Sequence, residues 1–244
     1  MYNLKNMRKI KTILSLISLL SLSLLLNGCN KVYVQDGEDQ LVMNGNNMAE
    51  TENLNNLLNR AQKVSNISYE VKMIDPKGKI TPQQIWLKDK KMRFKTTVDS
   101  KEIISIFDQD NNFIYIYTPS ENKAIKMSLH LGQGTEKSIV DKAADLEQYQ
   151  PEIIGTETID NKNCLIIQYK FGGYLTKEWL WKKYGLPIKI ESETPDGKVI
   201  TSYENFNFNP IADNMFELPG GIEITDLSSG LPNINGLNLD NIKQ

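Results

Sequence analysis

The stretch ISYEVKM, residues 67–73, decides the fold class because its apolar and polar side chains alternate. Successive side chains of a strand point to opposite faces, so this period of two predicts a half-buried strand. The stretch MRFKTTV, residues 92–98, repeats the pattern. Such strands are typical of antiparallel sheets, which can keep one face in water. We expect an apolar concavity to be lined by Tyr69, Val71, Met73, Met92 and Phe94.

Turn motifs separate further runs of the same kind. They lie at residues 75–78, 108–111, 119–122, 160–163, 172–173 and 195–197. Asp-Pro-x-Gly, Asn-rich and Gly-Gly turns at this spacing predict an antiparallel meander. A sheet of about ten strands tends to curl or close. The expected fold is therefore mainly β (α+β), with a strongly curved antiparallel sheet or incomplete β-barrel.

Two amphipathic helices interrupt this pattern. Apolar residues recur at helical spacing from Leu54 to Val64, with Thr51 or Asn53 available as the N-cap. Ile139 and Ala143 begin a second helical face within residues 135–149. We expect both helices to cover the concave side of the sheet.

The N-terminus has the features of a secretory leader. Four basic residues precede an uncharged apolar segment, Thr12 to Leu26, which is short beside the ~20 residues of a membrane span. The segment ends Leu26-Asn27-Gly28-Cys29, which resembles the bacterial lipobox. The resemblance implies cleavage between Gly28 and Cys29 and acylation of Cys29, with chains such as palmitate. Two acyl chains would hold the protein stably at a membrane. The alternative is a plain leader followed by an unmodified cysteine.

Composition sets the domain plan and excludes one class of partner. We predict a lipoprotein signal peptide at 1–28, a lipidated cysteine and flexible tether at 29–50, one domain at 51–227 and a flexible tail at 228–244. The chain has 28 basic and 30 acidic residues, and the leader takes away four basic ones, so the mature chain is acidic. Scattered lysines without a basic patch argue against nucleic acid as a partner.

The sequence has no recognisable catalytic constellation. Its one histidine, His130, has no separate orienting group that we can name, and no CxxC or HExxH motif predicts a metal. We therefore expect that the protein is not an enzyme and that it binds neither a cofactor nor a metal ion. Cys164 lies within a strand pattern and is interpreted as a structural thiol; a redox or intermolecular role is the alternative.

Two strands carry apolar groups on both faces. They are residues 113–117, FIYIY, and residues 102–107, EIISIF. A strand that is buried on both sides needs cover on both sides. Either another segment of this chain provides it, or the strand belongs to a protein-protein surface, where exposed aromatic residues are favoured. The candidate partner surface comprises Phe113, Tyr115, Tyr117, Trp179 and Trp181, and the two tryptophans admit the same two interpretations.

The C-terminal half carries an ordered set of motifs. They are GLPIKIE at 185–191, PDGK at 195–198, YENF at 203–206, NP at 209–210, IAD at 211–213 and FELP at 216–219. With the two helices, this order resembles the LolA/LolB-like lipoprotein-carrier superfamily over most of residues 50–227. The resemblance implies an incomplete antiparallel barrel with helices over an apolar concavity.

Within that superfamily the chain looks most like the anchored germination lipoproteins of the GerS type. The lipobox, the Asn-rich tether and the motifs KKMR at 90–93 and PSENK at 119–123 carry this resemblance. It implies a non-enzymatic adaptor that stabilises a spore-cortex N-acetylmuramoyl-L-alanine amidase and is needed for germination. It also implies a lipid-anchored protein on the extracytoplasmic face of the cell membrane, or in the intermembrane space of the forespore. The alternatives are a carrier of acyl chains or lipoproteins and an envelope sensor.

Overall fold

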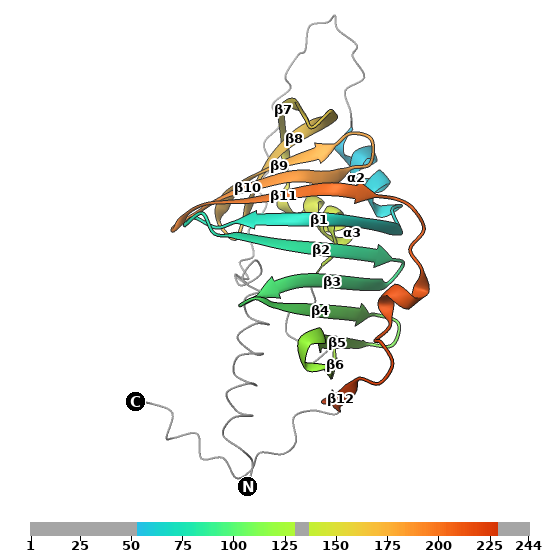
Figure 1. Cartoon of the computed structure of the whole chain (residues 1–244). Coiled ribbons are helices and arrows are strands. Elements are labelled where there is room, and N and C mark those ends of the chain that lie inside the picture. Colours follow the sequence, from blue (N-terminus) through green and yellow to red (C-terminus); the bar gives the residue numbers. More distant parts are fainter. Residues whose placement is uncertain (1–52, 130–136, 229–244) are drawn as a thin grey trace, which may run out of the picture. The chain divides into compact units, whose positions relative to one another are not determined.

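The computed structural model describes residues 53–129 and 137–228 (Figure 1). The α-helices are α2 (Leu54–Gln62) and α3 (Ile139–Asp145). The strands are β1 (Asn66–Ile74), β2 (Ile80–Lys88), β3 (Lys91–Val98), β4 (Lys101–Asp108), β5 (Phe113–Thr118), β6 (Lys123–Ser128), β7 (Glu152–Ile159), β8 (Lys162–Phe171), β9 (Tyr174–Trp181), β10 (Leu186–Thr194), β11 (Gly197–Asn207) and β12 (Glu223–Asp226). Three 3₁₀ turns are η1 (Pro119–Glu121), η2 (Leu146–Tyr149) and η3 (Asp213–Phe216).

The strands have the order β12-β6-β5-β4-β3-β2-β1-β11-β10-β9-β8-β7 in an open sheet. The prediction of a mainly β fold with an open sheet and two helices is therefore confirmed. Packing divides the chain into two compact units, which are described separately. Unit 1 comprises the described parts of residues 1–63 and 139–195, and unit 2 those of 64–138 and 196–244.

Unit 1 contains both helices and an antiparallel meander, β10-β9-β8-β7. Helix α2 begins as predicted, because the Asn53 Oδ1 atom accepts a hydrogen bond from the Asn55 amide at 2.9 Å. Its buried face is formed by Leu57, Leu58 and Ala61. Helix α2 packs against α3, and α3 packs against β10. The apolar face of this meander is thus covered by helices of its own unit.

Gly185, in the turn between β9 and β10, allows helix α2 to approach closely. Its φ angle is +72°, a conformation that L side chains rarely adopt. A Cβ atom at this position would overlap the carbonyl oxygen of Leu57 in α2. On the same turn, the Lys182 carbonyl accepts a hydrogen bond from the Arg60 guanidinium at 2.6 Å. The turn is therefore a docking point for the helix.

Unit 2 is a meander of β6-β5-β4-β3-β2-β1-β11 with β12 added beside β6 (Figure 1). The alternation predicted for residues 67–73 is confirmed from Ile67 to Val71, where every second residue is buried. The register aligns the buried side chains across strands: Tyr69 is opposite Ile85, and Ile85 is opposite Phe94. Because a period of two fixes which face is buried, this register places the apolar set on one side.

The last strand departs from the predicted antiparallel meander. Strand β12 pairs with β6 in parallel, with Glu223 opposite Lys123 and Asp226 opposite Lys126. The reason is that β11 is followed by residues 208–222, which include η3 and carry the chain to β6. A parallel pair requires such a crossover connection, whereas a short hairpin produces only antiparallel neighbours.

Candidate functional site

Most of the residues predicted to line a concavity are buried in unit 2. Tyr69, Val71, Met92 and Phe94 are all buried, and Met73 is partly exposed. The Tyr69 ring stacks on Phe206 at 5.9 Å between centroids, and Phe94 meets Phe107 edge to face at 5.4 Å. These side chains therefore pack as a core in this unit.

The tyrosine-bearing strand β5 is covered on its second face by a segment of the same chain. Tyr117 is 8% exposed and belongs to a cluster with Ile104, Ile106, Ala124 and Phe216. Partly buried side chains packed against this cluster are Trp86, Tyr115, Ile211, Met215, Leu218 and Ile222. Of the two alternatives left open by the sequence, the structure favours intramolecular cover for Tyr115 and Tyr117. An accessible partner surface at Tyr117 is wrong, because the crossover between β11 and β12 lies over it.

Two basic side chains attach this crossover to the sheet. Lys88 Nζ lies 3.1 Å from the Ile211 carbonyl oxygen and 2.8 Å from Asp213 Oδ1. The Arg93 guanidinium donates to the Met215 carbonyl at 2.9 Å and lies 5.9 Å from the centroid of the Trp86 ring. Hydrogen bonding to Lys88 lowers the pKa of Asp213, and burial lowers the pKa of Arg93. Phe113, by contrast, is partly exposed beneath Lys126, whose Nζ is 4.9 Å from the ring centroid.

Trp179 and Trp181 lie in unit 1 on the face of β9 that carries Cys164 and Ile166 opposite them. Trp179 is buried, and its indole N–H donates to Glu157 Oε2 of β7 at 2.7 Å. Lys189 Nζ lies 4.7 Å from the Trp179 ring centroid. Trp181 is half-buried and meets Tyr184 edge to face at 4.6 Å. The structure thus brings the two tryptophans onto one face, as predicted, and gives each of them intramolecular partners.

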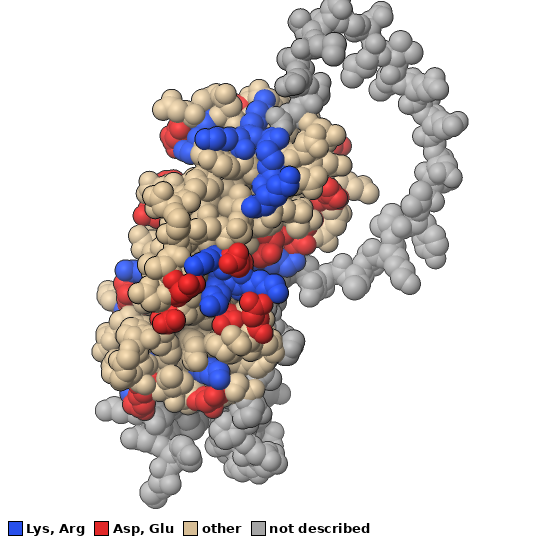
Figure 2. Space-filling model, turned by 90° about the vertical axis from the view of Figure 1, so that its right-hand side faces the viewer, with Lys and Arg blue, Asp and Glu red and all other residues tan. Residues whose placement is uncertain are grey.

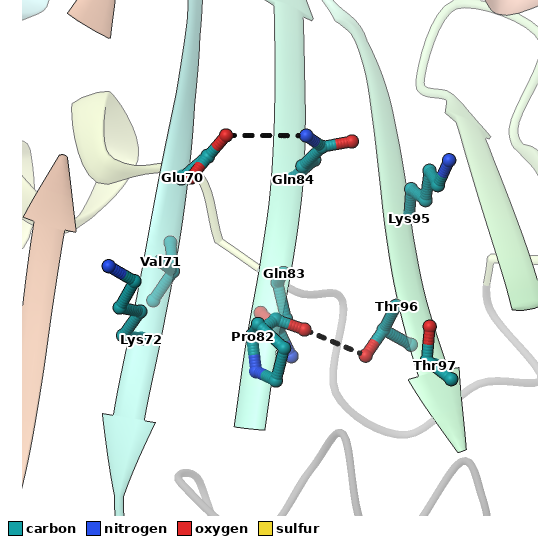
Figure 3. Close-up of a pocket in the computed structure, with 9 residues that line it drawn as sticks. All are labelled: Glu70, Val71, Lys72, Pro82, Gln83, Gln84, Lys95, Thr96 and Thr97. Carbon is teal, nitrogen blue, oxygen red and sulfur yellow. Dashed lines mark hydrogen bonds between the residues drawn. The ribbon is translucent and has the colours of Figure 1, made fainter. Parts of the chain in front are cut away.

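A shallow pocket of about 190 Å³ lies over β1, β2 and β3 in unit 2 (Figure 3). Polar side chains that line it have partners within the pocket: the Gln84 side-chain amide donates to Glu70 at 3.3 Å, and the Thr96 hydroxyl donates to the backbone carbonyl of Pro82 at 3.2 Å. Lys72 and Lys95 form ion pairs with carboxylates of neighbouring strands. The pocket thus contains paired polar groups rather than a nucleophile with a base.

Charged side chains on neighbouring strands of unit 2 form pairs of opposite sign. Figure 2 shows basic and acidic side chains side by side over the middle of the face in view. In unit 2 the cross-strand pairs include Lys72 with Glu204 at 2.6 Å and Lys95 with Glu102 at 2.6 Å. The hydrogen bond to Glu204 raises the pKa of Lys72. Opposite charges on adjacent strands stabilise a sheet modestly.

Glu178 is the most perturbed ionisable group of unit 1. It is 4% exposed, on the face of β9 that carries Thr176 and Leu180, and it accepts a hydrogen bond from the Tyr169 hydroxyl at 2.7 Å. Burial raises the pKa of Glu178 to about 7, while the Tyr169 hydroxyl and the Lys142 charge on α3 act in the opposite direction. Tyr149 of η2 stacks on Tyr169 at 5.7 Å. This carboxyl therefore takes up a proton near neutral pH.

The remaining predicted sites are either outside the described residues or buried. Cys29, Gly28 and His130 lie outside the described residues. Cys164 is a buried free thiol, and burial raises its pKa, which agrees with a structural role. Over residues 53–129 and 137–228, no group of three acidic, His or Cys side chains could hold a metal ion. No helix within those ranges is long and apolar enough to cross a membrane.

The sequence pattern did not reveal the exposed edge of unit 1. Strand β7 ends the meander and pairs with β8. Ile153 and Ile154 are 46% and 45% exposed on this strand, and a bulge lies between Ile153 and Gly155. Two adjacent isoleucines followed by Gly-Thr interrupt the regular alternation of EIIGTETI, residues 152–159. That interruption could have indicated the bulge, but the edge position of β7 depends on the strand order of the whole sheet.

Comparisons with known proteins give a fold but no family. No family model matches the chain, and no curated protein matches it. Among solved structures, an uncharacterized conserved protein from Thermus thermophilus has a TM-score of 0.53 at 8% identity, covering 70% of this chain and 98% of its own. The Pseudomonas aeruginosa MucA/MucB complex has a TM-score of 0.44 at 12% identity, covering 74% and 67%. A LolA superfamily protein from Nitrosomonas europaea has a TM-score of 0.32 at 13% identity, covering 68% and 97%.

At these identities the similarity shows a shared fold and nothing more. The evidence for the shared fold is the match to the Thermus thermophilus protein. The observed order of helix, strands, helix and strands is the order that the sequence predicts. The finer resemblance to GerS-type lipoproteins is not supported by these comparisons.

Proposed function

We propose that this chain is a membrane-anchored, non-enzymatic binding protein that acts as an adaptor for a cell-wall amidase. Acylated Cys29 would place the domain on the extracytoplasmic side of the membrane, in the intermembrane space of the forespore if it works there. The partner would be an N-acetylmuramoyl-L-alanine amidase that modifies spore cortex. The LolA-like motifs and the lipobox support this proposal through resemblance.

One observation carries the binding role. Unit 1 exposes Ile153 and Ile154 on a strand at the end of its meander. Contiguous exposed apolar patches mark interaction sites, whereas scattered single residues do not. MucB has been solved in complex with MucA, but its similarity to this chain is low, at a TM-score of 0.44. The binding role therefore rests on the two isoleucines of β7.

An acyl-chain carrier is the competing function. Burying ten methylenes would contribute about 8 kcal/mol before costs, so a carrier should retain lipid through purification. The ring pairs Tyr69–Phe206 and Phe94–Phe107 favour the adaptor, because each of these side chains already has an aromatic partner. An acyl chain would have to displace such contacts to enter unit 2.

Native mass spectrometry of the full chain tests the proposal. The tagged protein would be extracted in detergent from sporulating cells, and its mass compared with that of the acylated chain alone. An added protein mass in fixed ratio, identified as an amidase, is the expected result. An added mass of lipid size without protein would indicate a carrier, and peptidoglycan cleavage by the protein alone would overturn the non-enzymatic assignment.

A further inference from the structure

We propose that β7 is a docking edge, at which an extended, basic segment of a partner protein adds as one more strand. The inference rests on the proposed binding function and specifies how the partner is recognised. Addition of a strand to an open sheet edge supplies backbone hydrogen bonds, and alternate side chains supply specificity.

The backbone of β7 offers a regular template on its outer side. Its pairing with β8 is continuous from Gly155, opposite Ile166, to Ile159, opposite Lys162. The bulge lies before this stretch, so residues 155–159 keep the regular geometry of a strand. Edge strands that avoid pairing usually are very short or carry a proline, a β-bulge or charged side chains, especially lysine. Strand β7 has eight residues and contains neither lysine nor proline.

The side chains of β7 indicate the chemistry of the added strand. Glu152 lies opposite Gln168, and Glu157 lies opposite Cys164, so the bulge brings both glutamates to the same face. Both are exposed, Glu157 accepts the indole N–H of Trp179, and β7 itself has no basic residue. A segment with Arg or Lys on that face would complement the charge of β7, since opposite charges on adjacent strands attract. Ile153 and Ile154 add exposed apolar contacts.

A second copy of this chain fits the edge poorly. In an antiparallel pair of two β7 strands related by a two-fold axis, the same face of each strand lies on the same side. Glu152 and Glu157 of both copies would then share one face, and like charges on neighbouring strands are destabilising. A basic strand from a different protein avoids this repulsion. We therefore infer that the added strand belongs to a different protein.

The edge strand of unit 2 provides the contrast that makes a control possible. Strand β12 has only four residues, and its charges are compensated on β6 by ion pairs Lys123–Glu223 at 2.9 Å and Lys126–Asp226 at 3.5 Å. Ile224 on this strand is 47% exposed, which matches the exposure of Ile154. A lysine at either position adds the same charge to an equally exposed site.

Fluorescence anisotropy with labelled peptides tests the inference on the full, detergent-extracted chain. The probe is a peptide of alternating arginine and valine, and its control replaces each arginine by glutamate. We expect the arginine peptide to bind at least about tenfold more tightly, because it complements Glu152 and Glu157. Ile154→Lys should weaken its binding about tenfold, whereas Ile224→Lys should leave it within about twofold. Binding of the arginine peptide should also slow amide exchange at residues 155–159.

Two results of this binding assay would overturn the inference: equal affinity for both peptides, including no binding of either, or equal effects of the two lysine variants. The second result would mean that the arginine peptide responds to net charge alone. A different result would refute the adaptor function: a native mass of the wild-type protein that includes no co-purified protein. A bound amidase whose retention is unaffected by Ile154→Lys would leave the adaptor role standing and refute the docking edge.

Discussion

The two units cover their apolar surfaces in different ways. Unit 1 places two helices over one face of its meander and leaves the eight-residue edge β7 exposed. Unit 2 covers the second face of β4 and β5 with residues 208–222, and the same crossover ends in the short edge β12. Both covers are attached by an arginine that donates to a backbone carbonyl: Arg60 to Lys182, and Arg93 to Met215.

This difference indicates where a partner can bind. In unit 2 the aromatic strand and the edge beyond it are occupied by the protein's own crossover. In unit 1 the edge has no such neighbour among the described strands. Interaction surfaces are therefore expected on unit 1. Substitutions that loosen the cover over the apolar face of each unit test this difference.

The largest effect is expected from Gly185→Ala in unit 1. The new Cβ would overlap the Leu57 carbonyl and would also require an unfavourable φ of +72°. We expect a loss of about 4 kcal/mol or more in the free energy of unfolding, measured with urea. The control is Gly221→Ala in unit 2, where φ is +76° but nothing lies within 4 Å, so the loss should be about 1 kcal/mol. Equal losses would show that α2 does not dock on this turn.

Phe216→Ala tests the cover of unit 2. Phe216 is buried against Ile104 and Tyr117, so its truncation should cost about 3 kcal/mol of unfolding free energy. Amide exchange should also become faster in β5, because the crossover is loosened. Leu175→Ala, at a 40% exposed site of unit 1, should change stability by less than about 0.5 kcal/mol. Unchanged exchange in β5 would contradict the assigned cover.

Glu178 makes unit 1 sensitive to pH. Its pKa is raised from a usual value of 4.5 to about 7, so the folded state binds the extra proton between these values and stability falls as pH rises through that window. The shift corresponds to about 3 kcal/mol, lost between pH 5 and 8 and constant above. Glu178→Gln should remove this slope and be the more stable protein at pH 8. The control Glu152→Gln, on an exposed glutamate of β7, should keep the slope.

The two arginines should give the smallest effects. Arg93→Met removes the hydrogen bond to Met215, and Arg60→Met removes the one to Lys182. Each loss should lower the free energy of unfolding by about 1 kcal/mol. Faster amide exchange should appear in η3 for the first variant and in α2 for the second. If the two variants changed exchange in the same segments, the two units would not be covered independently.

The sequence was sufficient for local structure wherever one period dominated. Alternation at residues 67–73 predicted β1, and Asn53, one of the two candidate caps, is the N-cap of α2. Periodicity is local, however, so it could not show that residues 208–222 cross the sheet and enter β12 in parallel. It also could not show that Glu178 lies opposite Ile167 and Ile190 on a buried face, because that depends on the register of three strands.

The candidate site was only partly predictable for the same reason. Apolar residues on both faces of β5 correctly indicated that both faces need cover, but whether that cover is a partner or the chain itself depends on a distant segment. The exposed edge β7 follows from the strand order, which no pattern within residues 152–159 specifies.

The most direct test of the account compares the native masses of three full-length proteins extracted from sporulating cells: the wild type, Ile154→Lys and Ile224→Lys. The account predicts that the wild type and Ile224→Lys carry a partner protein in fixed ratio and that Ile154→Lys has lost it. A partner retained equally by all three would contradict binding at β7, and no bound protein in the wild type would contradict the adaptor function itself.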